Sequence, residues 1–397
     1  MSTRQAIILS AEWSPRTNFI LGKKDIEEKL TYLGSKVWRY PRLEIGDIKK
    51  TQIKDNEVLV RVKACGICGS DVHMAQADKD GYIFYPGLTA FPVVLGHEFA
   101  GLVAGAGKNA INKSTGKIFT EGEAVCAEEM IWCSFCRPCA DGYPNHCENL
   151  QELGFSINGA FTEYVAINSR YVWSLDELKD SLGDGDELFV AGSLVEPCSV
   201  AYNAVIERGG GIRPGDNVVI LGGGPIGLAA SAILKRAGAS KVILSEPQKE
   251  RADIAKKMGV THIINPVKED FAGRVLDITN GYGANLYLEA TGLPQIVFPG
   301  IEKAVWEGKA LNAKIVIVAR ADAKIPVTGE VLQVRRASII GAQGHSGHGT
   351  FPRVISSMAS GMDMRPIVTK RIKLENVPQH IISLQTDRKE CKVTALI

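Results

Sequence analysis

Hydrophobic and polar residues alternate over short segments in the first part of the chain, up to about residue 200. Glu57–Lys63 and Phe99–Val103 are examples, and many Gly and Pro residues stand between such segments. This pattern predicts mostly antiparallel β structure with long loops. Three stretches without a clear period are predicted to be excursions or surface insertions, namely residues 12–40, Lys108–Thr120 and Asp176–Asp186.

The pattern changes between residues 200 and 343, where strand-like and helix-like runs alternate. Alternating β and α segments with apolar strands predict a parallel, doubly wound sheet, so the fold class is α/β. The predicted strands are Asn217–Leu221, Lys241–Ser245, His262–Ile264, Leu286–Leu288 and Lys314–Val318, and the predicted helices are Leu228–Ala237, Gln248–Met258 and Glu269–Thr279.

The last segment, from residue 344 to 397, has one helical stretch around Val354–Ser360 and is too short for a domain of its own. We therefore expect it to pack on the first part. The predicted domains are residues 1–199 together with 344–397, and residues 200–343.

Composition narrows the possible functions. Basic and acidic residues nearly balance, at 46 against 44, and no charged tract stands out, which argues against a nucleic acid or an anionic membrane as partner. Apolar runs end before the ~18 residues of a membrane helix, and the N-terminus has no signal-peptide core. Nine cysteines, an odd number, do not indicate a secreted disulfide framework. We expect a cytoplasmic protein.

A glycine-rich turn follows the predicted strand Asn217–Leu221. Gly222, Gly224 and Gly227 match the G-x-G-x-x-G motif, in which the glycines allow a tight turn, close approach of a pyrophosphate and close helix–strand packing. Ile226 lies within the turn, at the start of the helix whose N-terminus would hold the phosphate charge. Such a turn can also be a plain connector, but here both flanking elements are predicted.

Glu246 ends the next predicted strand, 19 residues after Gly227, where a ribose-binding carboxylate belongs. A carboxylate accepts hydrogen bonds from a 2′-hydroxyl and repels a 2′-phosphate, so Glu246 favours NAD over NADP. Arg251 could serve a phosphate, but beside the acid we expect it to pack near the adenosine.

Four closely spaced cysteines indicate a structural zinc site. Cys133, Cys136, Cys139 and Cys147 have the spacing C-x2-C-x2-C-x7-C, and a tight loop of four thiolates can form a closed tetrahedral site. The lobe around them, about residues 126–150, has little apolar core, so a metal would stabilise it. Free thiols, a disulfide or an iron–sulfur cluster are the alternatives.

A second set of metal-ligand types is spread along the chain. Cys68, His97, Glu98 and Glu196 combine thiolate, imidazole and carboxylate groups, a set that suits zinc with one open position. None of these residues is specific alone, and Cys65-x-x-Cys68 could instead be a redox motif or half of another metal site.

Together these motifs resemble the zinc-containing medium-chain dehydrogenases, which include alcohol, sorbitol and threonine dehydrogenases. The segments that carry the resemblance are CGICGSDVH, GHE, the four cysteines, VEP and GGGPIG, in this order. The resemblance covers nearly the whole chain and implies a GroES-like catalytic domain completed by the C-terminal tail, with a Rossmann domain between them. It also implies two zinc ions per chain, an NAD cofactor, and a homodimer or homotetramer.

The resemblance assigns roles to the second set. Cys68 and His97 hold the catalytic zinc, Glu98 and Glu196 complete its sphere in alternation with water or substrate, and Cys65 is not a ligand. Glu196 stands where the liver-type enzymes have Cys, so the chain follows the polyol branch. Ser70 and His73 match the proton relay, and they are predicted to be catalytic together with Glu98.

The substrate is predicted to be a polyol or an inosose, oxidised at a secondary hydroxyl. The segments LGSKVWRYP, GYIFYPGLTAFP and GAQGHSGHGTFPRVISSMASGMDM resemble members of the family that act on keto-inositols in inositol breakdown. His345, Ser346 and His348 lie among glycines where substrate contacts are expected, although the same stretch could be a hinge with solvent-facing histidines. A sorbitol, threonine or butanediol dehydrogenase is the main alternative, and a non-enzymatic NAD-binding protein is the other.

Overall fold

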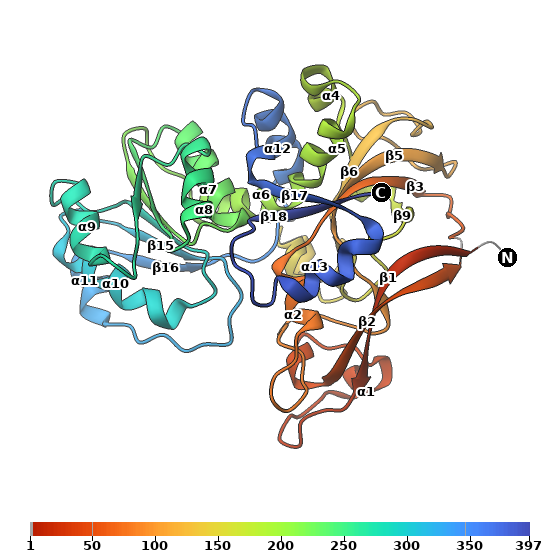
Figure 1. The fold of residues 1–397 in the computed structure, drawn as a ribbon, viewed down its shortest axis with the longest axis horizontal. Coiled ribbons are helices and arrows are strands. Elements are labelled where there is room, and N and C mark those ends of the chain that lie inside the picture. Colours follow the sequence, from red (N-terminus) through yellow and green to blue (C-terminus); the bar gives the residue numbers. More distant parts are fainter. Residues whose placement is uncertain (1–2, 50, 346) are drawn as a thin grey trace.

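A six-stranded parallel sheet forms the core of one of two lobes (Figure 1). The structure is a computed structural model that describes residues 3–49, 51–345 and 347–397. In the sheet, the strand order is β13-β12-β11-β14-β15-β16, and every neighbouring pair is parallel. The strands are β11 (Asn217–Leu221), β12 (Lys241–Ser245), β13 (His262–Ile264), β14 (Leu286–Glu289), β15 (Lys314–Ile317) and β16 (Ser338–Gly341).

The connecting helices confirm the doubly wound prediction. They are α7 (Pro225–Arg236), α8 (Lys249–Lys257), α9 (Phe271–Ile278), α10 (Pro294–Glu307) and α11 (Gly329–Arg335). The chain winds outward from β11 through β12 to β13 and then returns to β14 on the other side of β11. The carboxyl ends of β11 and β14 therefore form the switch point at which sheets of this kind bind ligands.

The second lobe is built around a seven-stranded sheet of order β10-β6-β5-β3-β18-β17, with β9 also paired to β3. Its pairs are antiparallel except β17 with β18. The strands are β3 (Glu57–Gly66), β5 (Glu98–Ala106), β6 (Ala124–Ala127), β9 (Tyr164–Asn168), β10 (Val172–Ser174), β17 (Val368–Lys373) and β18 (Lys392–Leu396). Because β18 pairs with β3, the C-terminal segment contributes a strand to this sheet.

Smaller elements surround this sheet. A three-stranded sheet of order β2-β1-β4 projects from the lobe in Figure 1, and a short pair, β7 with β8, lies near the cysteine-rich loop. The bounds are β1 (Thr3–Trp13), β2 (Trp38–Lys49), β4 (Val93–Val94), β7 (Met130–Ile131), β8 (Gln151–Glu152), α1 (Lys23–Glu28), α2 (Gly69–Ala75) and α3 (Arg137–Ala140).

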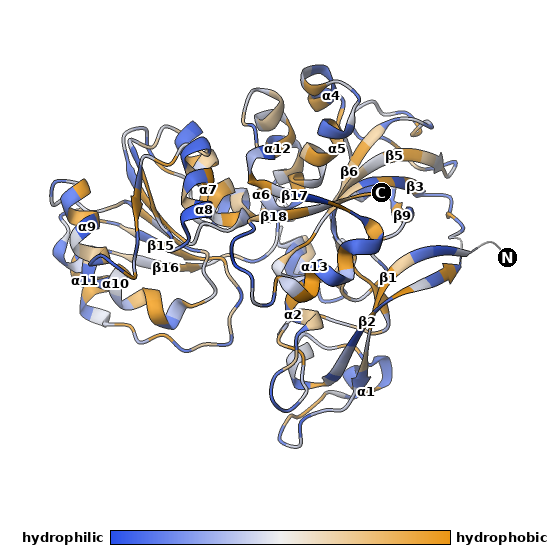
Figure 2. Ribbon diagram, in the orientation of Figure 1, coloured by the Kyte–Doolittle hydropathy of each residue, from blue (hydrophilic) through white to orange (hydrophobic). Residues whose placement is uncertain are grey.

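Five further helices belong to the lobe of the seven-stranded sheet or lie where that lobe meets the parallel sheet. They are α4 (Asp176–Leu182), α5 (Asp186–Ser193), α6 (Val195–Tyr202), α12 (Thr350–Ala359) and α13 (Val377–Ser383). Apolar residues of α5 and α6 belong to the same buried cluster as Val218 of β11, Leu228 of α7 and Phe351 of α12. Figure 2 shows this apolar character on α6 and α7. The core therefore runs from one lobe into the other.

The continuous helix Asp186–Arg208 is long and apolar enough to span a membrane by length and composition alone. However, 83% of its most apolar window is buried inside the protein, which is the behaviour of a core helix. A helix that is buried on all sides is also expected to be apolar on all sides.

Two of the predicted insertions are in fact ordered elements. Asp176–Asp186 contains α4, whose Leu178 is buried in the main core. Within residues 12–40, α1 forms and β2 begins at Trp38, which packs edge-on against Trp13 and Phe91 at ring distances of 5.0 and 5.1 Å. The long β1–β2 pairing and this aromatic contact hold residues 12–40 in place. Neither of them produces a periodic pattern of hydrophobic residues in the sequence.

Candidate active site

Three potential metal ligands meet between β3 and β5. Cys68 lies after β3 as the N-cap residue of α2, and His97 and Glu98 lie at the start of β5. One ligand atom from each of the three lies within 4.8 Å of the others. His97 and Glu98 are buried, at 3% and 1% exposed, whereas Cys68 is only half-buried. The structure therefore brings together Cys68, His97 and Glu98, three of the four residues of the predicted set, and this mixed donor set fits zinc.

Asp71 is a residue of this site that the sequence did not single out. Its Oδ2 accepts a hydrogen bond from the Cys68 backbone N–H at 2.8 Å, and its Oδ1 lies 3.7 Å from His97 Nδ1. Burial lowers the pKa of His97, but the Asp71 carboxylate, Cys68 and Glu196 together more than reverse this effect, so that the pKa of His97 is raised well above its usual range. A carboxylate behind one ring nitrogen is the arrangement that orients a metal-binding histidine.

Lys392, at the first position of β18, pairs with Glu98. Its Nζ lies 2.6 and 2.7 Å from the two carboxylate oxygens and also donates to the Ile67 carbonyl at 3.0 Å. Both side chains are almost fully buried. Gly66 makes room for the pair, because a Cβ there would lie 2.2 Å from Glu98 Oε2.

The proposed relay residues lie on α2. Ser70 Oγ is 3.5 Å from His97 Nε2, so the serine lies beside the Cys68 group. His73 is half-buried one turn further on. Burial, and to a smaller extent the positive charge of Arg388, lower the pKa of His73, which favours its neutral form. Neutral imidazole can accept a proton.

The four-cysteine lobe forms a compact group of sulfur atoms. All four lie within 4.8 Å of one another. Backbone N–H groups of Cys133, Cys136 and Asn149 point at the sulfurs of the group at 3.3–3.4 Å. Burial is the largest single influence on Cys133 and opposes its ionisation, but hydrogen bonds from the Phe135 and Cys136 backbone and from side chains together outweigh it and lower the pKa of this thiol to about 6. These features fit a zinc ion bound by thiolates.

The glycine turn has the geometry of a phosphate cradle. Gly222 has a positive φ of 102°, and a Cβ at Gly227 would lie 1.9 Å from the Gly222 carbonyl oxygen. At Gly224, the N-cap residue of α7, an added Cβ would meet nothing within 4 Å, which leaves the space in front of the helix open. Ile226 lies in the first turn of this helix. The turn therefore fits a dinucleotide.

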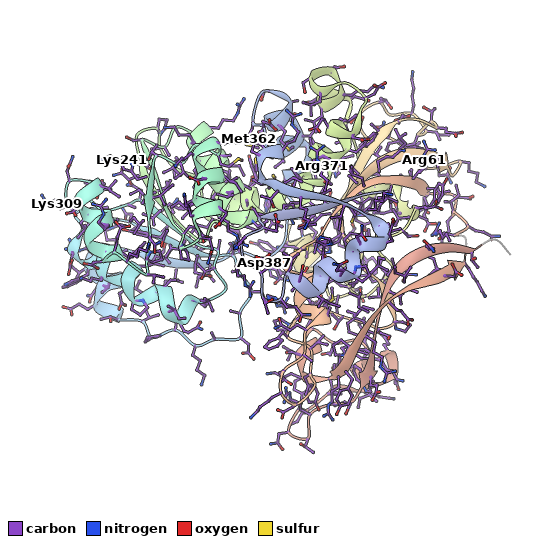
Figure 3. All side chains as sticks on the ribbon, in the orientation of Figure 1. Arg61, Lys241, Lys309, Met362, Arg371 and Asp387 are labelled. Atoms are coloured by element: carbon purple, nitrogen blue, oxygen red, sulfur yellow. The ribbon has the colours of Figure 1, made fainter. Side chains whose placement is uncertain are left out.

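The residues beyond β12 lie beside this turn. The Glu246 carboxylate accepts hydrogen bonds from the backbone N–H groups of Gly223, at 2.7 Å, and Gln248, at 2.8 Å. Arg251 reaches instead toward the C-terminal segment and donates to the Glu390 carbonyl at 2.7 Å. Figure 3 places Asp387, from the same segment, at the junction of the two lobes.

The two histidines of the predicted substrate segment have different surroundings. His348 is exposed, with a positive φ of 54°, as the hinge alternative expected. His345 is completely buried, and its Nε2 hydrogen-bonds to Glu129. Ser346 lies outside the described residues.

His345 and Glu129 belong to a buried group that sequence reasoning missed. Together with Glu196 they form a set whose ligand atoms lie within 4.8 Å of one another, and the charges of Cys68, His97 and Glu98 also act on Glu196. Two adjacent acids, Glu128 and Glu129, between the apolar segments Ala124–Ala127 and Met130–Ile131 were the signal that could have identified the group.

Known proteins resemble this chain over nearly its full length. A family model described as an alcohol dehydrogenase GroES-like domain matches residues 54–177, and one described as a zinc-binding dehydrogenase matches residues 225–360. The scyllo-inosose 3-dehydrogenase of Thermotoga maritima is 65% identical over 393 residues, which cover 99% of each chain. An L-threonine 3-dehydrogenase of Bacillus subtilis is 33% identical over 82% of this chain and 86% of that one.

Solved structures agree with these matches. A structure from Thermotoga maritima superposes with a TM-score of 0.96 at 64% identity and covers 99% of this chain and 100% of its own. The 2R,3R-butanediol dehydrogenase of Bacillus subtilis superposes with a TM-score of 0.74 at 25% identity, over 98% and 99% of the two chains.

Proposed function

Because this chain belongs to the zinc-containing medium-chain alcohol dehydrogenases, we propose that it is an NAD-dependent enzyme that oxidises a ring hydroxyl of scyllo-inosose, or of a closely related cyclic polyol, to a ketone. The observation that carries the proposal is the meeting of Cys68, His97 and Glu98 in a chain that also has the open glycine turn at Gly224. When bound, zinc acts as a Lewis acid on the substrate hydroxyl and the nicotinamide accepts the hydride.

Two separate sets of residues would hold the two zinc ions. Cys68 and His97 would bind the catalytic zinc, with Glu98 and Glu196 as the carboxylates available to complete its sphere. The thiolates of Cys133, Cys136, Cys139 and Cys147 would hold a structural zinc.

The cofactor would lie across the switch point of the parallel sheet. Gly222, Gly224, Ile226 and Gly227 would form the pyrophosphate turn, and Glu246 would accept hydrogen bonds from the adenosine ribose. Arg251 would lie at the edge of the adenosine site.

The hydroxyl proton must leave a buried site. Ser70 lies beside His97, and the half-buried His73 lies one helical turn away, with a pKa that favours the neutral form. Ser70 would pass the proton outward and His73 would accept it and release it to water.

We also infer the organisation of the molecule. Residues 1–199 and 344–397 would form the catalytic domain, and residues 200–343 the cofactor domain. Exposed apolar side chains such as Ile296 and Leu311 would suit a homodimer or homotetramer. Metal-holding cysteines fit the reducing conditions of the cytoplasm.

Metal analysis combined with a substrate screen tests the proposal. The purified protein should contain two zinc ions per chain and should reduce NAD with scyllo-inosose faster than with sorbitol, L-threonine or 2,3-butanediol. Cys68→Ala should abolish turnover while Cys126→Ala, a buried cysteine outside both metal sets, should not. Activity of the Cys68→Ala protein near that of the wild type would overturn the zinc assignment, and preference for L-threonine would overturn the substrate.

A further inference from the structure

Four buried side chains, here called the acid–histidine cluster, lie next to the proposed catalytic zinc set. They are Glu129, Glu152, Glu196 and His345. His345 Nε2 hydrogen-bonds to Glu129 and lies 3.8 Å from Glu196 Oε1. His345 has no exposed surface, whereas the three acids each keep 6–8% exposure.

The cluster and the Cys68 set share one electrostatic environment. His97 helps to lower the pKa of Glu129, and Cys68 contributes to the raised pKa of Glu196. Burial is the largest influence on both carboxyls, and it raises the pKa in each case. Phe155, three residues after Glu152, packs against the His97 ring at 4.6 Å between ring centres. The acids therefore line the surroundings of the reacting atoms.

Three separate parts of the fold hold the cluster in place. Glu129 immediately precedes β7, and Glu152 lies in β8, where it is paired with Met130. The Glu129 carbonyl accepts a hydrogen bond from Leu153 N–H at 3.0 Å, which fixes the two acids side by side. Glu196 comes from α6.

His345 arrives on the segment that returns from β16 to the catalytic lobe. Asn145 donates to the Gln343 carbonyl at 2.7 Å, and Asn203 donates to the Gly344 carbonyl at 2.9 Å. A Cβ at Gly344 would lie 2.6 Å from Met130 Sδ, so glycine permits this close approach. The segment is therefore anchored by both the cysteine-rich lobe and the helix after α6.

The cluster has more hydrogen-bond acceptors than its own donors can use. The Glu129 carboxylate, whose pKa is lowered, offers about four lone-pair positions, and an imidazole has only two ring nitrogens. One of the His345 nitrogens is committed to Glu129, and Glu128 lies 3.8 Å from the other. An O–H donor on a bound molecule can use the remaining acceptor positions of the Glu129 carboxylate.

We propose that the acid–histidine cluster recognises substrate hydroxyls remote from the reacting carbon, and that it selects a neutral, hydroxyl-rich ring over anionic substrates. The inference rests on the proposed function. Neighbouring hydroxyls of a cyclic polyol can donate to the two oxygens of one carboxylate, and hydrogen bonds to a charged acceptor are the strong ones. A phosphate or carboxylate on the substrate meets like charge instead, which disfavours it.

Kinetics with two substrates test the cluster separately from the reaction. Glu129→Gln keeps the size of the side chain but removes its charge and one acceptor. It should lower kcat/KM for scyllo-inosose by about 10-fold or more, while kcat/KM for trans-1,2-cyclohexanediol, which lacks the remote hydroxyls, should change by less than about 3-fold. The Kd of NADH should stay unchanged. Glu187→Gln, at a partly exposed glutamate of α5 that pairs with Arg371, is the matched control and should leave both substrates unaffected.

Two further measurements keep the proposal falsifiable. If Glu129→Gln does not fold, Glu152→Gln should give the same selective loss. If wild type turns over no diol, the Kd of scyllo-inosose in the enzyme–NADH complex, measured by calorimetry, should rise about 10-fold in the variants.

The outcomes separate the possibilities. Equal losses on both substrates would overturn recognition of remote hydroxyls. A third metal ion per chain that is lost on Glu129→Gln would show a metal site instead. Absence of NAD-dependent activity toward every polyol in the wild type would overturn the proposed function itself, whereas activity that is indifferent to both Glu129 and Glu152 would overturn only the cluster.

Discussion

Lys392 Nζ lies 2.6 Å from Oε2 and 2.7 Å from Oε1 of Glu98, and this ion pair links the last strand of the chain to the proposed catalytic metal set. The two residues are separated by 294 positions in the sequence. Since Cys68, His97 and Glu98 lie close together, Lys392 adds a positive charge directly behind the carboxylate. The C-terminal strand is therefore part of the site's electrostatics.

We expect Lys392→Met to destabilise the protein by roughly 3 kcal/mol, because it leaves the Glu98 carboxylate buried without its partner. The double variant Glu98→Gln/Lys392→Met leaves no unpaired buried charge at this place, so its loss of stability should be smaller than that of Lys392→Met. Urea denaturation in the presence of EDTA measures both without interference from bound metal. A double variant less stable than Lys392→Met would contradict this interpretation.

The four-cysteine lobe should depend on its metal. Its apolar core is small and includes Leu88, Met130 and Leu150 together with the cysteines themselves. Cys136→Ala should therefore reduce the zinc content from two ions to one and lower the melting temperature by roughly 5 °C or more. Cys126→Ala is the control and should retain both ions. Full zinc content in the Cys136→Ala protein would disprove the assignment.

Much of the fold could be predicted from the sequence where hydrophobic periodicity is local. β11, β12 and β13 have the bounds predicted from their apolar runs. α10 was missed because Pro294 and Pro299 indicate a break, although Pro294 occupies the first helical turn, where no N–H donor is required. The helices of Asp186–Arg208 were also missed, since a helix buried on most sides has no polar face to set a period.

The site could be predicted only as far as its motifs extend. Cys68 and His97 stand in recognisable segments, but Lys392 approaches Glu98 through the β18–β3 pairing, which no local pattern encodes. In the segment after Gly344, the two histidines predicted to contact substrate have different environments, because His345 turns into the protein and His348 faces solvent. Such burial depends on tertiary packing rather than on residue type.

Cofactor choice should depend on Glu246. Its carboxylate lies beside the backbone of the glycine turn, where a 2′-phosphate would meet its negative charge. Glu246→Ala should lower kcat/KM for NAD by about 10-fold and raise it for NADP. Steady-state kinetics with both cofactors measure the change, and Glu250→Ala, an exposed acid on α8, is the control. An unchanged NAD to NADP ratio would remove Glu246 from the ribose site.

Glu152 should make stability depend on pH. Burial, followed by repulsion from Glu129, raises the pKa of Glu152 from 4.5 to about 7. Between these values the folded protein holds the proton more tightly than the unfolded chain, so this group lowers the free energy of unfolding as pH rises. Glu152→Gln should therefore gain stability relative to wild type between pH 5 and pH 8, by up to about 3 kcal/mol. Denaturation at pH 5 and at pH 8 measures the free energy of unfolding of both proteins. An equal difference between variant and wild type at the two pH values would contradict the raised pKa of Glu152.

Proton release should depend on His73. Burial and the Arg388 charge lower its pKa, so the neutral, accepting form extends to lower pH and is lost only as pH falls through the lowered value. His73→Ala should reduce kcat at pH 7 by about 10-fold or more and recover partly at higher pH or with added imidazole, since an external base can then take the proton. Arg388→Gln removes a lowering charge, so it should raise the pKa of His73 and move the acidic limb of the pH–rate profile to higher pH. The half-buried His380, on α13, gives the control variant His380→Ala. If His73→Ala responds to neither pH nor imidazole, and Arg388→Gln leaves the profile in place, His73 has no part in proton release.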